Sequence, residues 1–254
     1  MDNVFKLVLA LLLTVAISSC NKVSDQEFEV NGVKFKMIAV EGGSFMMGAT
    51  PGQGDDAREN EKPAHKVTVD DFLIGETEVT QELWFAVMGN NPSVFKYKAG
   101  NYPVENVSWN DVHVFIKKLN EITCQQFRLP FEAEWEYAAR GGKKSTDKKY
   151  SGSDDIDEVA WYKDNASGTT HAVATKKANE LGLYDMSGNV WEWCEDWYGN
   201  YTGDEQYNQQ GTLGRNEMVM RGGSWYNLIN ISGRRNYKPE TLGSDYGFRL
   251  LINN

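Results

Sequence analysis

The sequence predicts an α+β fold with little regular secondary structure. Alternating stretches typical of strands, and three segments with the helical spacing of apolar residues, all lie in the first 140 residues. The last hundred residues give few such signals, although the chain carries 24 Gly, eight Trp, twelve Tyr and eleven Phe. Many rings and glycines without long apolar runs indicate a loop-rich domain that aromatic side chains hold together.

Three stretches near the N-terminus are predicted strands. Residues 33–40 alternate between apolar and polar side chains, and residues 45–48 resume this pattern after a turn at residues 42–44. Residues 66–72 alternate again. Between them, residues 50–62 are rich in Gly, Asp, Glu and Asn, so we expect a solvated loop there.

Three helices are predicted by their caps and apolar spacing. Thr80 is a suitable N-cap for a helix that stops at Gly89. Ser108 and Asp111 have the spacing of a capping box, and an apolar stripe follows them. A third helix is expected at about Phe131–Arg140, with a Phe at the position of its cap.

The first twenty residues resemble the signal of a bacterial lipoprotein. Lys6 gives a short positive region, and Leu7 to Ile17 is an unbroken run of apolar, Ala and Thr residues. This run is too short to span a bilayer, which takes about 20 residues. Two Ser residues then precede Cys20, so that residues 17–20 resemble a lipobox, in which the Cys thiol is acylated.

The resemblance implies a chain that is tethered by lipid on Cys20. We expect residues 1–20 to be the signal peptide and polar residues 21–32 to form a tether. The membrane is then a partner through the lipid, and the protein belongs to the bacterial cell envelope. Asn21 is not the Asp associated with inner-membrane retention, which favours the outer membrane. An ordinary cleaved signal with an incidental Cys is the alternative.

The net charge of −10 argues against nucleic acid as a partner, although it also fits a role in solubility alone. After Cys20, the remaining cysteines are Cys124 and Cys194. They are either paired in an oxidising compartment or two separate thiols, and two cysteines do not make a disulfide framework.

Four motifs in order carry a family resemblance. They are residues 42–48 (GGSFMMG), 127–142 (FRLPFEAEWEYAARGG), 179–193 (NELGLYDMSGNVWEW), and 221–225 (RGGSW) with the closing 247–250 (GFRL). Together they resemble the formylglycine-generating enzyme family, also called the sulfatase-modifying factor domain, over about residues 33–254. The resemblance implies a variant of the C-type-lectin fold.

The third motif contains a possible calcium site. Asp185 and Glu192 would supply carboxylates, and Gly188 and Val190 would supply backbone carbonyls, which is a ligand set that suits Ca²⁺. The same positions match a calcium site in the family. The alternative is that these carboxylates cap turns and pair with Arg side chains.

The resemblance does not extend to the oxidase's metal. The family enzyme binds copper through two cysteines, and the matching positions here hold Asn227 and Ser232. Because soft thiolates are the ligands for Cu(I), copper is not expected and no catalytic residue is assigned. His65, His113 and His171 are interpreted as structural or surface residues.

The predicted function is therefore non-catalytic, either as a binding module or as an assembly module of the cell envelope. The segment 226–246 lies where the oxidase has its substrate groove, and it is rich in Tyr and Asn, which give adaptable recognition. The expected partner is a protein or small ligand, and the segment also resembles the variable region of lectin-fold proteins diversified by retroelements. The alternative for this segment is a plain solvated surface. The alternative function is a divergent oxidase that acts on the cysteine of sulfatases. The candidate ligand-binding residues are Tyr226, Asn227, Asn230, Ser232, Tyr237 and Tyr246.

Overall fold

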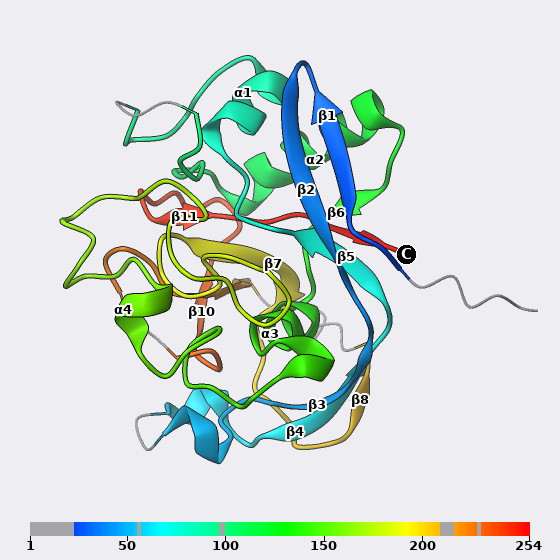
Figure 1. Ribbon diagram of the computed structural model, residues 1–254, viewed down its shortest axis with the longest axis vertical. Coiled ribbons are helices and arrows are strands. Elements are labelled where there is room, and N and C mark those ends of the chain that lie inside the picture. The colour runs from blue at the N-terminus through cyan, green and yellow to red at the C-terminus, as the bar shows by residue number, and fades with distance from the viewer. Residues whose placement is uncertain (1–22, 55–56, 97–99, 209–215, 228–229) are drawn as a thin grey trace, which may run out of the picture.

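The computed structural model describes residues 23–54, 57–96, 100–208, 216–227 and 230–254. Figure 1 shows short strands and helices joined by long loops, so the prediction of an α+β fold with little regular structure is confirmed. No helix within these ranges is long and apolar enough to cross a membrane.

The described strands form sheets of five, four and three strands, in the orders β1-β2-β5-β12-β6, β10-β9-β7-β11 and β3-β4-β8. Strand β12 lies between β5 and β6 and pairs antiparallel with both. The C-terminal segment is therefore built into the middle of the largest sheet. The bounds are β1 Gln26–Val30, β2 Val33–Val40, β3 Gly43–Met47, β4 His65–Val69, β5 Phe72–Gly75, β6 Phe127–Arg128, β7 Trp191–Trp197, β8 Gln206–Tyr207, β9 Met218–Arg221, β10 Arg234–Tyr237, β11 Tyr246–Gly247 and β12 Leu251–Asn253.

The N-terminal hairpin corrects one prediction. Strand β1 pairs with β2, and the turn between them is Asn31-Gly32, whose residues both have positive φ. Phe28 on β1 packs against Phe35 and Phe127, which gives the strand an apolar face to bury. The expected tether over residues 21–32 is therefore wrong from residue 26 onward, and the domain begins before Val33.

The helices are α1 Gln81–Met88, α2 Trp109–Thr123, α3 Glu132–Ala139 and α4 Ile156–Val159. The predicted caps of the first two are confirmed. The Thr80 hydroxyl accepts a hydrogen bond from the Leu83 amide, and Ser108 and Asp111 each accept one from the other's backbone N–H. Gly89 ends α1 in the left-handed conformation at φ 76°.

Helix α3 begins without a side-chain oxygen at its cap, Phe131, a loss that costs about 1 kcal/mol unless another group substitutes. Two carboxylates do so. Glu134 accepts a hydrogen bond from the Phe131 amide at 2.7 Å, and Asp196 on β7 accepts one from the Glu132 amide at 2.5 Å. The second bond also fixes the start of α3 against the four-stranded sheet.

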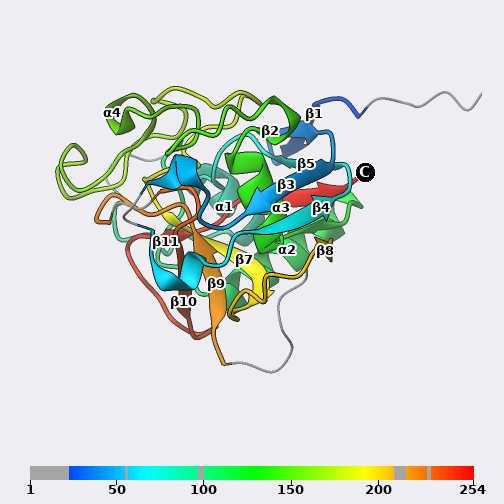
Figure 2. The same ribbon diagram turned by 90° about the horizontal axis from the view of Figure 1, so that it is seen from below.

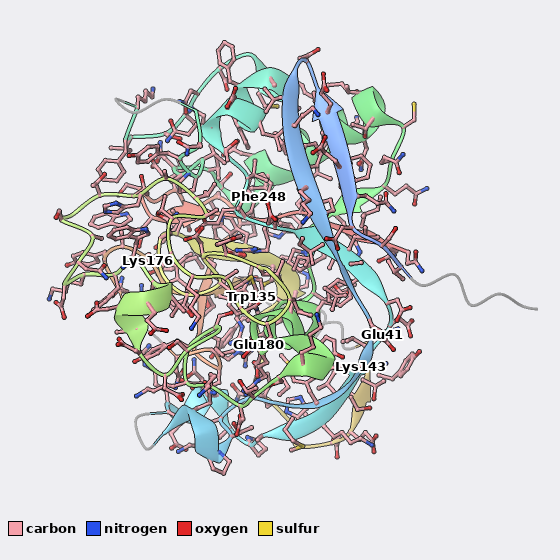
Figure 3. The ribbon with its side chains drawn as sticks, viewed as in Figure 1. Glu41, Trp135, Lys143, Lys176, Glu180 and Phe248 are labelled. Atoms are coloured by element: carbon pink, nitrogen blue, oxygen red, sulfur yellow. The ribbon has the colours of Figure 1, made fainter. Side chains whose placement is uncertain are left out.

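The core has two main parts (Figure 3). One part lies between the largest sheet and helices α1 and α2, where Phe248 packs edge-on against Phe115 at 5.4 Å. The other surrounds Trp135 of α3. Trp135, Trp191 and Trp193 are fully buried, and Trp197 packs at the edge, which agrees with the expectation that aromatic side chains hold a loop-rich domain together.

Buried ion pairs join α3 to the four-stranded sheet. Glu132 binds Arg234 on β10 through two hydrogen bonds of 2.6 and 2.7 Å. Glu136, four residues later, pairs with Arg221 on β9 and, at 2.8 Å, with Arg140. All five side chains are less than 8% exposed. The position of β9 and β10 therefore depends on these charges.

The loop over residues 50–62 corrects a second prediction. It contains two short 3-10 turns, Pro51–Gln53 and Glu59–Glu61, and Gln53 and Glu61 are buried. The loop is therefore not simply solvated. Cys124 and Cys194 are both free thiols, the first exposed and the second buried, so the disulfide alternative is excluded for this structure.

The ion pair at the start of α3 makes a testable prediction for stability. Glu132→Gln would leave the Arg234 guanidinium buried without its charge partner, so we expect the free energy of unfolding to fall by about 3 kcal/mol. Urea denaturation measures this. The matched control is Glu27→Gln, which breaks the exposed pair with Lys34 and should leave the midpoint unchanged. Equal losses in the two variants would show that burial of the pair does not matter.

Candidate functional site

The predicted ligand-binding residues do not form one surface. Tyr226 is 58% exposed, and two others are half-buried. The remaining three are less than 9% exposed and serve the interior. The half-buried residues are Asn227 and Tyr237, and the buried ones are Asn230, Ser232 and Tyr246.

Ser232 is a structural hydrogen-bonding residue. Its hydroxyl donates to the Glu61 carboxylate at 2.6 Å, and its backbone N–H donates to the Gln53 side chain at 3.3 Å. The Asn230 amide also reaches the Gln53 carbonyl, at 3.4 Å. These bonds tie the segment after β9 to the loop over residues 50–62. Sequence reasoning missed Gln53 and Glu61, because nothing local in a polar loop indicates that it will be buried.

Asn227 lies at the other position that matches a copper cysteine. Its side-chain oxygen accepts from Arg235 at 3.5 Å, and its backbone N–H donates to the Ser224 hydroxyl at 3.3 Å. Neither Asn227 nor Ser232 offers a soft ligand.

Burial raises the pKa of the Cys194 thiol well above its usual range, and this disfavours the thiolate that a metal needs.

Three aromatic side chains pack together next to Asn227 in the sequence or across from it: Trp225, Tyr226 and Phe95. Trp225 packs edge-on against Tyr226 at 5.6 Å and against Phe95 at the same distance. Phe95 comes from a loop that Glu105 holds, since the buried Glu105 carboxylate accepts from the Phe95 amide at 2.9 Å. Burial raises the pKa of Glu105 to about 7. Sequence patterns did not predict this contact, because it joins Phe95 and Trp225, which lie 130 positions apart.

The loop of the third motif surrounds Glu192. Its carboxylate binds Arg249 through two hydrogen bonds of 2.6 Å and also accepts from the Trp135 indole at 2.6 Å. Asp185 accepts from the Ala174 amide with one oxygen. Glu78, which the sequence did not single out, accepts from the Asn189 side chain at 3.0 Å.

Glu192 pairs with Arg249, as in the alternative in which these carboxylates pair with Arg side chains, so calcium binding at this loop stays a prediction. Three buried carboxylates, from Glu78, Asp185 and Glu192, face the single guanidinium of Arg249. Burial raises the pKa of Asp185 to about 6, and its Oδ1 has no hydrogen-bond partner among the described residues. No group of three or more His, Cys, Asp or Glu side chains in the described ranges is arranged to hold a metal. Backbone carbonyls would therefore have to complete the site, as in the predicted ligand set.

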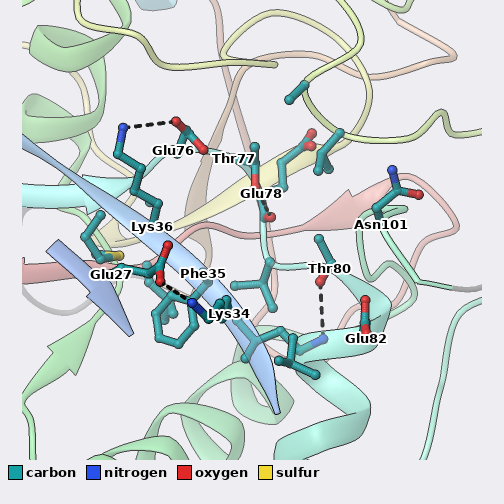
Figure 4. Close-up of a pocket in the computed structure, with 18 residues that line it drawn as sticks. Glu27, Lys34, Phe35, Lys36, Glu76, Thr77, Glu78, Thr80, Glu82 and Asn101 are labelled. Carbon is teal, nitrogen blue, oxygen red and sulfur yellow. Dashed lines mark hydrogen bonds and ion pairs between the residues drawn. The ribbon is translucent and has the colours of Figure 1, made fainter. Parts of the chain in front are cut away.

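A separate pocket of about 390 Å³ lies between β2 and the segment that links β5 to α1 (Figure 4). Lys34 and Lys36 at its rim are paired with Glu27 and Glu76. The buried side chain of Glu78 contributes to the wall. The pocket contains none of the predicted ligand-binding residues, and the segment 226–246 stays a prediction as a binding site.

The three histidines lie apart and each packs on an aromatic ring. His65 packs on Tyr201, His113 on Trp109, and His171 is stacked on Trp161 at 3.8 Å. They share no site, in agreement with their interpretation as structural or surface residues.

The fold and the four motifs together define a domain of the formylglycine-generating-enzyme type, on a lectin-like scaffold. A family model described as "Sulfatase-modifying factor enzyme 1-like domain" matches residues 25–254. The chain belongs to this family. The match begins one residue before β1, which agrees with a domain that includes the N-terminal hairpin.

Several relatives are similar along the whole domain. "Chaperone protein LppX" of Paenibacillus barcinonensis is 32% identical, over 96% of this chain and 98% of its own. The formylglycine-generating enzyme of Streptomyces coelicolor is 26% identical, over 84% and 87%. "Serine/threonine-protein kinase pkn1" of Chlamydia caviae is 30% identical, but the chain spans only 37% of its length. The solved structure of Treponema denticola variable protein 1 superimposes with a TM-score of 0.83 at 34% identity, covering 91% and 99% of the two chains.

We propose that Ca²⁺ binds at Asp185, Gly188, Val190 and Glu192, and this can be tested by thermal unfolding. Excess calcium should raise the melting temperature by about 5 °C over EDTA, because a ligand that binds only the folded chain stabilises it. Asp185→Asn should abolish the calcium dependence, whereas Asp154→Asn, at an exposed carboxylate, should keep it. Equal melting temperatures of the wild type in calcium and in EDTA would refute the site.

Proposed function

We propose that this chain is a non-catalytic binding module, anchored by lipid on Cys20 in the bacterial cell envelope. The absence of catalysis is proposed because Asn227 and Ser232 stand where the family resemblance puts the copper cysteines; the Ser232 hydroxyl donates to Glu61 at 2.6 Å, and the Asn227 oxygen lies 3.5 Å from Arg235. A site without sulfur cannot bind Cu(I) in the manner of the family enzyme. The scaffold is retained, and its surface is free for recognition.

The arrangement of the chain supports a surface presented away from the anchor. The described chain starts at residue 23 beside strand β12, on the side opposite to β10 and β11 in both views (Figures 1 and 2). Lipid on Cys20 would therefore hold the domain on the side where the described chain starts, opposite to β10 and β11. The segment with Tyr226 and Asn227 would face outward, towards a partner.

The names of two similar proteins support binding of another protein. One is described as a chaperone. Its alignment covers 96% of this chain, so it includes part of the first twenty residues. The other is called a variable protein, which accords with the predicted resemblance of residues 226–246 to a variable region. For this chain, the partner is a protein or a small ligand at residues 226–246, and nucleic acid is disfavoured by the net charge of −10.

The divergent oxidase is the second candidate, since a formylglycine-generating enzyme aligns along 84% of the chain. We expect the purified chain to bind no Cu(I) and to leave the cysteine of a sulfatase-motif peptide unconverted. The double variant Asn227→Cys/Ser232→Cys should gain Cu(I) affinity by at least about tenfold, because it restores two thiolates. Competition with a Cu(I) chelator and mass spectrometry of the peptide measure these outcomes.

Cys194→Ser serves as the control and should not change Cu(I) binding by either protein, since this thiol is buried and burial raises its pKa well above the usual range, which disfavours the thiolate. Stoichiometric Cu(I) binding or formylglycine formation by the wild type would overturn the non-catalytic function.

The anchor makes a separate prediction. The full chain expressed in a bacterium should partition into the detergent phase of Triton X-114, and Cys20→Ser should move it to the aqueous phase, because the acyl chains bind only through that thiol. Cys124→Ser is the matched control and should stay in the detergent phase. An N-terminal peptide of unmodified mass in the wild type would contradict lipidation.

A further inference from the structure

Arg235 on β10 stands beside Asn227 with hydrogen-bonding capacity to spare. The side chain is half-buried, and its guanidinium carbon lies 5.0 Å from the centre of the Trp191 ring. Its two hydrogen bonds with described residues, to the Asn227 side-chain oxygen and the Tyr237 hydroxyl, are both 3.5 Å long. This is at the outer limit for such bonds, so the five donors of the guanidinium are poorly used.

The absence of an acidic partner sets Arg235 apart. Among the residues that the structure describes, each of the other buried or half-buried arginines has a carboxylate within 3 Å, and Arg235 has none within 4 Å. The nearest candidate, Asp245, interacts with it electrostatically, but its carboxylate accepts a hydrogen bond from the Ser224 hydroxyl at 2.8 Å. The paired arginines are Arg128, Arg140, Arg221, Arg234 and Arg249.

A second donor nearby is also unused. The indole N–H of Trp191, the ring on which Arg235 stacks, is buried and has no hydrogen-bond partner within the described ranges. Buried donors are nearly always satisfied in folded proteins, by the protein itself or by a bound molecule. Two donor groups in one contact therefore lack a well-placed acceptor among the described residues, and a bound molecule could supply one.

We propose that Arg235 and Asn227 bind a carboxylate group of the partner. The planar fork of a guanidinium matches a carboxylate with two parallel hydrogen bonds. The Asn227 oxygen already faces Arg235, so its amide N–H₂ remains as a further donor. One positive charge matches one carboxylate, whereas a doubly charged phosphate would be under-compensated in a chain of net charge −10.

The surroundings suit an acid with an apolar or aromatic body. Tyr226, which precedes Asn227 in the sequence, is 58% exposed, and its ring packs against Trp225. Tyr, Trp and Arg side chains are enriched at interaction sites. The carboxylate site rests on the proposed binding function and specifies its chemistry. It fills the place of the copper site with a fixed positive charge.

Benzoate and its neutral analogue benzamide are the probes that test this. Equilibrium dialysis with the full chain in detergent micelles, corrected for micelles alone, should show saturable binding of benzoate and at least tenfold weaker binding of benzamide. Arg235→Gln should weaken benzoate binding at least tenfold, and Arg235→Lys should also weaken it, because an ammonium keeps the charge but loses the fork.

The matched control is Lys238→Gln, which removes one exposed positive charge three residues away and should leave affinity within about twofold. Equal affinity for benzamide, unchanged affinity in Arg235→Gln, or an equal loss in Lys238→Gln would overturn the proposal, as would tighter binding of inorganic phosphate. Circular dichroism and the melting temperature check that each variant is folded.

A short peptide with one Glu among apolar residues, compared with its Gln version, distinguishes the source of the carboxylate. Preference for the Glu peptide over benzoate indicates a protein side chain, and preference for benzoate indicates a small acid. Both outcomes support the carboxylate site. Its failure would leave the copper and formylglycine assays unaffected, so it is distinguishable from failure of the non-catalytic function.

Discussion

The pairing of α3 carboxylates with distant arginines is the constraint on which the rest of the structure depends. Glu132 and Glu136 lie one helical turn apart, and the arginines they bind come from β9 and β10 as well as from the end of the helix itself. Charges buried this deeply are tolerated only in pairs. A fold with short strands and long loops therefore gains from ionic contacts a fixed geometry that its regular structure alone would not give.

The same principle applies to the segment after β9. A buried polar group is tolerated when its hydrogen bonds are satisfied. Ser232 meets this condition through Glu61. Asn227 is half-buried, and its backbone N–H donates to the Ser224 hydroxyl while its side-chain oxygen lies 3.5 Å from Arg235. The interior of this segment is therefore held by hydrogen bonds, and the contact between Asn227 and Arg235 is left weak.

Local signals made much of the fold predictable. The caps at Thr80 and Ser108 satisfy backbone groups only a few residues away, so the sequence specifies them directly. The Asn31-Gly32 turn was equally visible, and a hairpin there was missed because the polar residues around it suggested a tether. The burial of Gln53 could not be read locally, since its partner Asn230 lies 177 residues away.

The candidate site was predictable in position but not in composition. The family motifs placed it beside residues 227 and 232. Whether a given Tyr or Asn there is exposed depends on loops elsewhere, as Tyr226 and the buried Asn230 illustrate. The sequence does not distinguish Arg235 from other arginines. It is unusual only by comparison with the other described buried or half-buried arginines, each of which has a carboxylate partner.

The central place of β12 has a consequence for biogenesis. Its pairing brings Leu251 beside Ile74 of β5 and Arg128 of β6, so the largest sheet is incomplete until residue 251 is available. A chain emerging from the ribosome, or threading through a secretion pore, has to keep β5 and β6 apart over most of its passage. Contacts of such long sequence separation are slow to form. Completion of the largest sheet therefore waits for the C-terminal residues of the chain.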